Sequence, residues 1–388
     1  MRSGHGVARC VAKTKTMFNQ IPGRENIKRE LKNMVSENRI PHALMFLGPE
    51  GNGGLATAFA FAQYLLCTDK VGEDSCSNCR NCRRIQSHTH PDLHYTFPVI
   101  SRKSQLGISS EFYEEWRELL AQNPYPSINQ WMNILEAENK QFNINKNECH
   151  QIVRQLSLKS VEAPYKIQII WLPEYLGKEG NRLLKIIEEP PADTLFFLVA
   201  QNTENILNTI ISRCQIMNIP SFTDEEIKAF AQNQWQLSEN KAQSLALLAE
   251  GNMSVAYNIV ADEADELTPL FIKWMRLAFQ DKDGKLVELV NEMAKLGRER
   301  QKQLLSLGLR LLRMMLLSRM AGSKPEGLEE SESVFVQKMG AFIDFDGLSQ
   351  LVELMDECFY AVERNANPKI LFLDVSFKIN GILRGVKA

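Results

Sequence analysis

The sequence lacks a long hydrophobic run and a strong net charge of either sign. Its longest apolar stretches, such as Leu195–Ala200 and Leu311–Leu317, fall well short of the ~20 residues that a membrane-spanning helix needs. Its formal net charge is −2, so the chain as a whole has no basic field of the kind that a strong, autonomous nucleic-acid binder uses. These absences exclude a membrane role and leave only local or shared contacts with nucleic acid.

A secretory signal is also lacking. Residues 1–16 contain four basic residues, no acid and no apolar core, and a second methionine follows at Met17. We expect residues 1–16 to be a disordered leader, or the product of a start codon set upstream of Met17, with a functional basic arm as the alternative. Without a signal the expected compartment is the cytoplasm, where thiols stay reduced.

A lysine is missing from a loop that otherwise has the spacing of a phosphate-binding loop. Such a loop reads G-x-x-x-x-G-K-[ST], in which the lysine reaches the outer phosphates and the hydroxyl holds magnesium. The stretch GPEGNGGL keeps Gly48 and Gly53 at this spacing, but Gly54 and Leu55 occupy the two chemical positions. The pattern predicts the shape of a nucleotide cradle without its charged parts.

Four of the eight cysteines lie in one short segment with the spacing C-x8-C-x2-C-x2-C. They are Cys67, Cys76, Cys79 and Cys82. Four thiolates at such spacing can surround a zinc ion tetrahedrally, and with no position left open for water the metal would be structural. The alternative, chance clustering of small buried residues, fits poorly with polar neighbours such as Asp74 and Asn78. We therefore predict a zinc module over residues 67–82.

The first half of the chain alternates strands with helices. Strands are expected at 42–47, around 90–98, at 165–172 and at 194–202, with helices between them. This alternation predicts a mostly parallel, doubly wound sheet over residues 17–220. The strand at 165–172 ends in Pro173 and a lone Glu174, where a nucleoside triphosphatase would carry an acidic pair for magnesium and water.

Residues 101–146 interrupt this alternation as a helical insert. Two amphipathic helices are expected, at 111–122 and 127–137, split by Pro124-Tyr125-Pro126. Trp116 and Trp131 lie on helical faces among Leu and Ile, which favours a small core over a base-stacking platform. The sequence assigns no role to the insert.

From residue 221 onward we expect only helices. Thr223 and Glu226 form a capping box, and two further helices hinge at Gly251, which predicts a small helical lid over 221–262. Residues 263–388 predict an all-helical domain, whose Leu- and Met-rich stripes indicate a bundle core or, alternatively, a groove for a partner. At 388 residues the chain is long enough for two or three domains.

These motifs together resemble one family. The order PHALMFLGPEG, four cysteines, HPD, NRLLKIIEEPPADTLFFLVA and ISRC is similar to that of the delta-prime family of clamp-loader subunits of bacterial DNA polymerase III. The resemblance runs from about Met17 to Pro220 and implies an AAA+ module, a helical lid and a C-terminal collar domain through which five subunits form a ring. It also implies gamma or tau and delta subunits as partners, and the sliding clamp and primed DNA indirectly.

The resemblance implies a subunit of the holoenzyme with no catalysis of its own. Active relatives carry G-x-x-R in the lid, where this chain has Gly251-Asn252-Met253-Ser254. The loop glycines would then serve as scaffold and no tight ATP binding is expected; they are Gly48, Gly51, Gly53 and Gly54.

Arg213, in the triplet Ser212-Arg213-Cys214, is the residue that the resemblance marks as catalytic. It implies an arginine finger that acts in trans at the nucleotide of the next subunit. The alternative is a surface arginine paired with a nearby acid such as Glu204. Cys214 is expected to pack the turn, with a reactive thiol as the alternative.

Two other classes of protein stay open. An autonomous AAA+ ATPase would need the missing lysine, hydroxyl and acidic pair. A zinc-dependent DNA-binding protein would be supported by Arg80, Arg83 and Arg84 beside the cysteines, but the near-neutral charge and the lack of interleaved aromatics oppose it.

Overall fold

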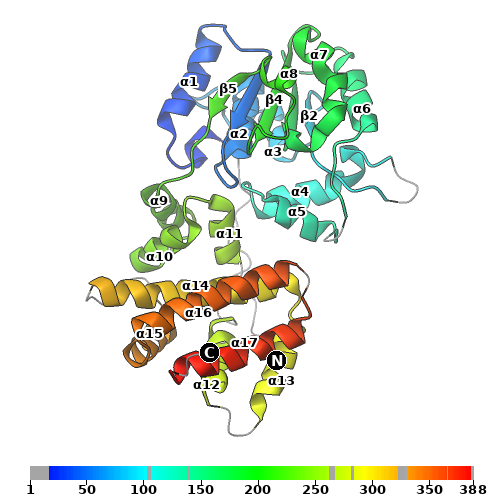
Figure 1. Ribbon diagram of the computed structural model, residues 1–388. Helices are drawn as coiled ribbons and strands as arrows, with labels where there is room; N and C mark the ends of the chain where they lie inside the picture. The colour runs from blue at the N-terminus through cyan, green and yellow to red at the C-terminus, as the bar shows by residue number, and fades with distance from the viewer. Residues whose placement is uncertain are drawn as a thin grey trace, which may run out of the picture. The chain divides into compact units, whose positions relative to one another are not determined.

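The chain folds into two compact units in the computed structural model of Figure 1. The structure describes residues 17–102, 106–137, 140–261, 267–280, 284–321, 328, 330–364 and 366–385, so the expected leader lies outside the described residues. The first unit comprises Met1–Gln236 and Ala249–Asn258, and the second comprises Leu237–Leu248 and Ile259–Ala388. A separate lid over 221–262 and a collar over 263–388 stay predictions.

A five-stranded parallel sheet forms the centre of the first unit. Its order is β2–β3–β4–β1–β5, and each neighbouring pair is parallel. The strands are β1 (Ala43–Leu47), β2 (Leu93–Thr96), β3 (Lys166–Trp171), β4 (Thr194–Ala200) and β5 (Gln215–Asn218). The parallel sheet confirms the expected fold class of this unit.

Helices cover both faces of the sheet. On one face α2 (Gly54–Leu66) packs Phe61 on Phe197 of β4, with ring centroids 5.3 Å apart. On the other face α6 (Lys146–Leu156) packs Ile152 and Cys149 in one cluster with Phe196 and Leu198. Because strands buried on both faces need no polar alternation, β4 is apolar along its length apart from Thr194, which is itself buried.

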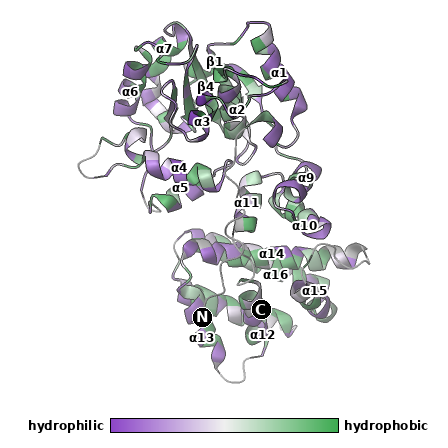
Figure 2. Cartoon of the chain, turned by 180° about the vertical axis from the view of Figure 1, so that it is seen from behind, coloured by the Kyte–Doolittle hydropathy of each residue, from purple (hydrophilic) through white to green (hydrophobic). Residues whose placement is uncertain are grey.

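Figure 2 shows α1 and α6 mostly in the hydrophilic colour, as expected for helices with one solvent face. Further elements complete the first unit. These elements are η1 (Phe18–Gln20), α1 (Glu25–Ser36), α3 (Arg80–Gln86), η3 (Pro173–Leu183), α7 (Leu184–Glu188), α8 (Asn208–Ile211), α9 (Asp224–Gln234) and α11 (Met253–Ala261). The capping box of α9 is confirmed, because the Thr223 hydroxyl accepts from the Glu226 amide and the Glu226 carboxylate accepts from the Thr223 amide.

The insert forms η2 (Ser109–Phe112), α4 (Tyr113–Gln122) and α5 (Ile128–Ile134) around a small aromatic core. Trp116 stacks on Phe97 with ring centroids 4.3 Å apart, and Trp131 donates its indole N–H to the Pro98 carbonyl at 2.7 Å. Both indoles are fully buried. The core interpretation of the two tryptophans is therefore confirmed, and neither ring is available to stack on a base.

The second unit is helical throughout its described residues. Its helices are α10 (Glu239–Ala249), α12 (Leu267–Phe279), α13 (Lys285–Ala294), α14 (Arg298–Ala321), α15 (Glu330–Phe342), α16 (Phe345–Glu363) and α17 (Pro368–Leu383). Phe271, Trp274 and Leu351 lie in one buried cluster that joins these helices. The apolar stripes are bundle core, as expected. Among the described residues, none of the helices is both long and apolar enough to cross a membrane.

Candidate functional site

The glycine-rich loop lies between β1 and α2, at the place where a phosphate-binding loop lies in an α/β fold. Gly51 and Gly53 have φ angles of 74° and 83°, a backbone region that favours glycine. The Gly48 amide donates to the Ala200 carbonyl at 3.1 Å and so ties the loop to β4. The sequence predicted this strand–turn–helix correctly.

The Asn52 side chain forms hydrogen bonds with backbone groups in and beside the loop. Its side-chain oxygen accepts from the Gly54 amide at 2.8 Å, and its side-chain nitrogen donates to the Ile219 carbonyl at 2.9 Å. Amides at the start of a helix are the groups that bind phosphate oxygens in active loops. Here the amide at the position of the missing lysine already has a buried partner from its own chain.

Aromatic rings pack on the loop from two directions. A methyl group added at Gly53 would lie 2.9 Å from the Phe222 ring and 3.3 Å from the Tyr125 ring. The space left between the loop, residues 124–126 and the ends of β3 and β4 is a cavity of about 30 Å³. Pockets that hold drug-sized ligands have volumes of roughly 300–1,000 Å³. The loop keeps the backbone turn of a phosphate-binding loop, and little open space remains beside it.

A carboxylate occupies the loop as well. Burial raises the pKa of Glu50, and hydrogen bonds from the Ile128 amide and the Gln201 and Asn252 side chains oppose that rise. The Ile128 amide lies in the first turn of α5, whose N-cap is Ser127, so an acidic side chain of the loop contacts a helix of the insert.

Glu174, the lone acid after β3, also has a structural partner. Its Oε1 accepts from the Gln201 and Asn202 amides at 2.5 and 3.0 Å. Burial raises the pKa of this carboxyl, and the two amides counter the rise. Glu174 therefore holds the chain where it leaves β4.

The segment Gly251–Ser254 lies directly on the loop. The Met253 amide donates to the Gly51 carbonyl at 3.1 Å, and a methyl group added at Gly51 would lie 1.8 Å from the Asn252 side-chain oxygen. Gly251 has a φ of 80°. The expected hinge is confirmed, but the sequence did not show that the hinge contacts the loop.

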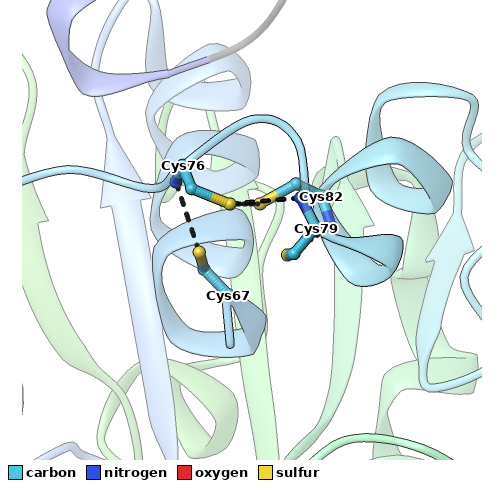
Figure 3. Close-up of side chains that lie close together, drawn as sticks. All are labelled: Cys67, Cys76, Cys79 and Cys82. Carbon is cyan, nitrogen blue, oxygen red and sulfur yellow. Dashed lines mark hydrogen bonds between the residues drawn. The ribbon is translucent and has the colours of Figure 1, made fainter. Parts of the chain in front are cut away.

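The four clustered cysteines turn their sulfurs toward one centre (Figure 3). Their Sγ atoms all lie within 4.8 Å of one another, and those of Cys76 and Cys82 are 3.9 Å apart. Tetrahedral zinc with Zn–S bonds of about 2.3 Å places its sulfurs about 3.8 Å apart. The cluster fits a structural zinc ion, and all four predicted ligands come together.

Backbone amides point at these sulfurs. Cys67 Sγ accepts from the Cys76 amide at 3.3 Å, Cys76 Sγ from the Cys79 amide at 3.2 Å, and Cys79 Sγ from the Cys82 amide at 3.4 Å. Burial raises the pKa of Cys79, but hydrogen bonds from Cys82 and Thr68 outweigh it and lower that pKa to about 6. Burial raises the pKa values of Cys67 and Cys82, so of these three thiols only Cys79 favours the thiolate, the form that binds metal.

The arginines beside the cysteines are engaged within the protein. Arg80 and Arg84 both pair with Glu162, at 3.2 and 2.7 Å. The loop that carries Glu162 is held in turn by Asp92, whose carboxylate accepts from the amides of Val161, Glu162 and Ala163 at 2.6–2.9 Å. Two of the three basic residues that could favour DNA binding therefore brace the cysteine helix α3.

Arg213 lies in the turn after α8 and pairs with Glu188. Its Nε and Nη2 donate to Glu188 Oε2 at 3.1 and 2.8 Å, and its Nη1 donates to the Thr209 carbonyl at 2.9 Å. Glu204 is not its partner, because Glu188 at the end of α7 reaches the guanidinium across the turn. Burial raises the pKa of Cys214 to about 12, so its thiol stays protonated and does not suit a nucleophile.

A parallel α/β unit with a phosphate-type loop that lacks the lysine and the hydroxyl, together with a four-cysteine module, defines the class of protein. A family model described as "DNA polymerase III, delta subunit" matches residues 23–223, more than half of the chain. The chain belongs to this family, and its expected resemblance to delta-prime subunits is confirmed.

Two delta-prime relatives match about half of the chain. DNA polymerase III subunit delta' of Bacillus subtilis (strain 168) is 29% identical over 192 residues, which cover 49% of this chain and 46% of that protein. The subunit of the same name from Escherichia coli (strain K12) is 29% identical over 178 residues, which cover 45% and 41%. The matches thus span less than half the length of these two relatives.

A further relative matches most of the chain. DNA polymerase III subunit tau of Bacillus subtilis (strain 168) is 23% identical over 381 residues, which cover 92% of this chain and 60% of that protein. Among solved structures, a gamma subunit-related protein of Thermotoga maritima aligns with a TM-score of 0.39 at 13% identity, over 92% of this chain and 99% of that chain.

Proposed function

We propose that the chain is a delta-prime-type subunit of a bacterial replicative clamp loader, without ATPase activity of its own, that supplies Arg213 in trans to a neighbouring ATPase subunit. Its role would be to help load the sliding clamp on primed DNA. The observation that carries the proposal is the closed loop: the glycine turn is intact, yet Asn52, Tyr125 and Phe222 occupy the surroundings where a nucleotide would bind.

The setting of Arg213 suits an arginine finger. Its side chain keeps 29% of its surface exposed, and its partner Glu188 is 56% exposed. An ion pair so open to water is worth only about 0–1 kcal/mol, so a phosphate of a neighbouring subunit can replace the carboxylate at little cost. The guanidinium is always charged and offers a planar fork of donors that matches phosphate oxygens.

The partners follow from the family. Gamma or tau subunits and a delta subunit would be the direct partners, while the sliding clamp and primed DNA would be reached through the assembly. Zinc at the four cysteines would fold the loop between α2 and α3 and take no part in chemistry. Such a complex works in the cytoplasm.

The test is reconstitution of the complete loader. The chain should co-purify with the gamma or tau and delta homologues of its own organism. A loader containing Arg213→Ala should assemble but lose the share of clamp- and DNA-stimulated ATP hydrolysis that belongs to the adjacent site, since an arginine finger contributes about 10³ to 10⁵ in rate there. Clamp loading should fall with it.

A matched control is Arg39→Ala, which removes an arginine that is 81% exposed and weakly paired with Glu37 at 3.6 Å. That variant should hydrolyse ATP normally. Unchanged turnover in a correctly assembled Arg213→Ala ring would overturn the assignment of the finger. Steady-state ATP hydrolysis by the isolated chain would instead favour an autonomous motor, and strong salt-dependent affinity of the isolated chain for primed DNA would favour a DNA-binding protein.

A further inference from the structure

Residues 123–130 of the insert form a compact segment that is seated on the glycine-rich loop. The Tyr125 side chain is 4% exposed, and its ring lies against the open face of Gly53. The Asn123 side-chain oxygen accepts from the Tyr125 amide at 2.8 Å, and prolines at 124 and 126 further limit the backbone. The ring is thus presented to the loop by a stiff turn.

The same tyrosine contacts the helical segments that follow the sheet. Its ring centroid lies 5.9 Å from that of Phe222, 6.4 Å from that of Phe230 and 5.6 Å from that of Tyr257. Phe230 belongs to α9, Phe222 lies just before the N-cap of α9, and Tyr257 belongs to α11. One side chain of the insert therefore contacts the loop, α9 and α11 together.

Polar contacts reinforce this bridge. The Gln130 side-chain nitrogen donates to the Asn258 side-chain oxygen, and the Ser254 hydroxyl donates to the Gln130 side-chain oxygen at 3.4 Å. The Asn123 side chain donates to the Ser254 hydroxyl at 3.4 Å. Glu50 of the loop receives the Ile128 amide in turn. These groups are partly or fully buried, where hydrogen bonds are costly to leave unmade.

A ligand that touches two parts of a protein at once stabilises the arrangement in which both parts are in place. A segment of the same chain does this at a high effective concentration and needs no free ligand. We propose that residues 123–130 are an internal ligand of the degenerate cradle, which holds residues 222–236 and 249–258 on the sheet in place of a nucleotide. This inference goes beyond the proposed function and concerns the isolated chain, so its test can fail while the clamp-loader role stands.

Hydrogen exchange of the full chain without nucleotide tests the inference. In Tyr125→Ala the backbone amides of residues 224–234 and 253–258 should exchange at least about tenfold faster, because opening of these segments no longer breaks the aromatic contacts. The amides of β3 and β4 should keep their rates. Tyr113→Ala is the matched control: Tyr113 lies in the same insert but donates its hydroxyl to the His88 carbonyl, away from α9 and α11.

Chemical rescue distinguishes the loss of the tyrosine ring beside the loop from general destabilisation of the variant. p-Cresol, which has the shape of the tyrosine side chain, should bind Tyr125→Ala and restore protection of residues 253–258, and it should change nothing in the unsubstituted chain. Unchanged exchange of residues 224–234 and 253–258 in Tyr125→Ala, an equal rise across β3 and β4, or no rescue by p-cresol would each overturn the inference.

A second variant keeps the test decisive if Tyr125→Ala does not fold. Gln130→Ala removes the hydrogen bonds to Ser254 and Asn258 without emptying the aromatic contact. Exchange of residues 253–258 should rise severalfold in this variant while β3 and β4 stay protected. Equal rates at residues 253–258 in Gln130→Ala and in the unsubstituted chain would contradict the proposal.

Discussion

Asp92 is the residue on which the position of the loop before β3 depends. Its carboxylate is 1% exposed and receives three backbone amides of residues 161–163. Through that loop it places Glu162, which braces Arg80 and Arg84 of α3. Without this buried acceptor the three amides would lose a hydrogen bond, which costs free energy. The carboxylate therefore stabilises the loop and, through Glu162, the position of α3.

We predict that Asp92→Ala lowers the free energy of unfolding by about 2–4 kcal/mol, since up to three amides lose a charged acceptor. Urea unfolding of the full chain measures the change. Glu30→Ala, an exposed acid of α1 in the same unit, should stay within about 0.5 kcal/mol of the unsubstituted chain. Equal stability of the Asp92 and Glu30 variants would show that the loop does not depend on the carboxylate.

Single residues were predictable from the sequence only where spacing along the chain carried the information. The cluster of Cys67, Cys76, Cys79 and Cys82 can be predicted because the four ligands are close in sequence. Glu188 lies 25 residues before Arg213 in the sequence, and Tyr125 is likewise distant from Gly53 along the chain. Folding brings each pair together, so the sequence alone does not show either contact. The wrong partner, Glu204, was simply the nearest acid in sequence.

The segment from Cys67 to Gln86 is the element whose folding depends most on its side-chain chemistry. It links the end of α2 to α3, and four backbone amides in it donate to cysteine sulfurs. A loop held in this way forms when the metal assembles its ligands and loosens when the metal leaves.

We predict one zinc ion per chain, lost in Cys79→Ser and retained in Cys214→Ser, as measured by metal analysis of the purified protein. Removal of the metal by a strong chelator should increase the hydrogen exchange of residues 67–86 while β3 and β4 keep their protection. Protein purified without zinc, or a Cys79→Ser variant with full zinc content, would contradict the metal site.

Strands were predictable from the sequence where all of their side chains are buried. β4 appears in the sequence as an almost continuous apolar run because both faces of the sheet are covered, and β3 is buried along its length although it contains Lys166 and Gln168. The edge strand β5 was missed: three of its four side chains are exposed, and only its pairing with β1 makes it a strand. Its apolar signal was too short to distinguish it from the turn that carries Arg213.

The whole molecule combines an α/β unit that has the loop of a nucleotide-binding protein with an all-helical unit. Neither net charge nor any single motif identifies its role. The fold class followed from the alternation of strands and helices, whereas the closed state of the loop could not, because it arises from residues 123–130, 222 and 252, which meet only in three dimensions.

We predict that the isolated chain does not bind ATP with magnesium at low micromolar Kd or tighter. The lysine and the hydroxyl are absent, and the Gly54 amide already donates to the Asn52 side chain. Isothermal titration calorimetry measures this directly. Tight binding in the low micromolar range would show that the cradle opens readily and that its closure is not a stable state.

The glycines of the loop have one more consequence. A methyl group at Gly48 would lie 1.9 Å from the Ile219 carbonyl oxygen, and one at Gly51 would collide with Asn252, so both positions need glycine for structural reasons that do not depend on a nucleotide. Natural selection can therefore preserve the glycine spacing of this motif long after its chemistry has gone. A search that scores glycines will count such chains as nucleotide-binding proteins, although the residues at positions 54 and 55, the lone acid after β3 and the side chains above the loop all differ from those of a working enzyme.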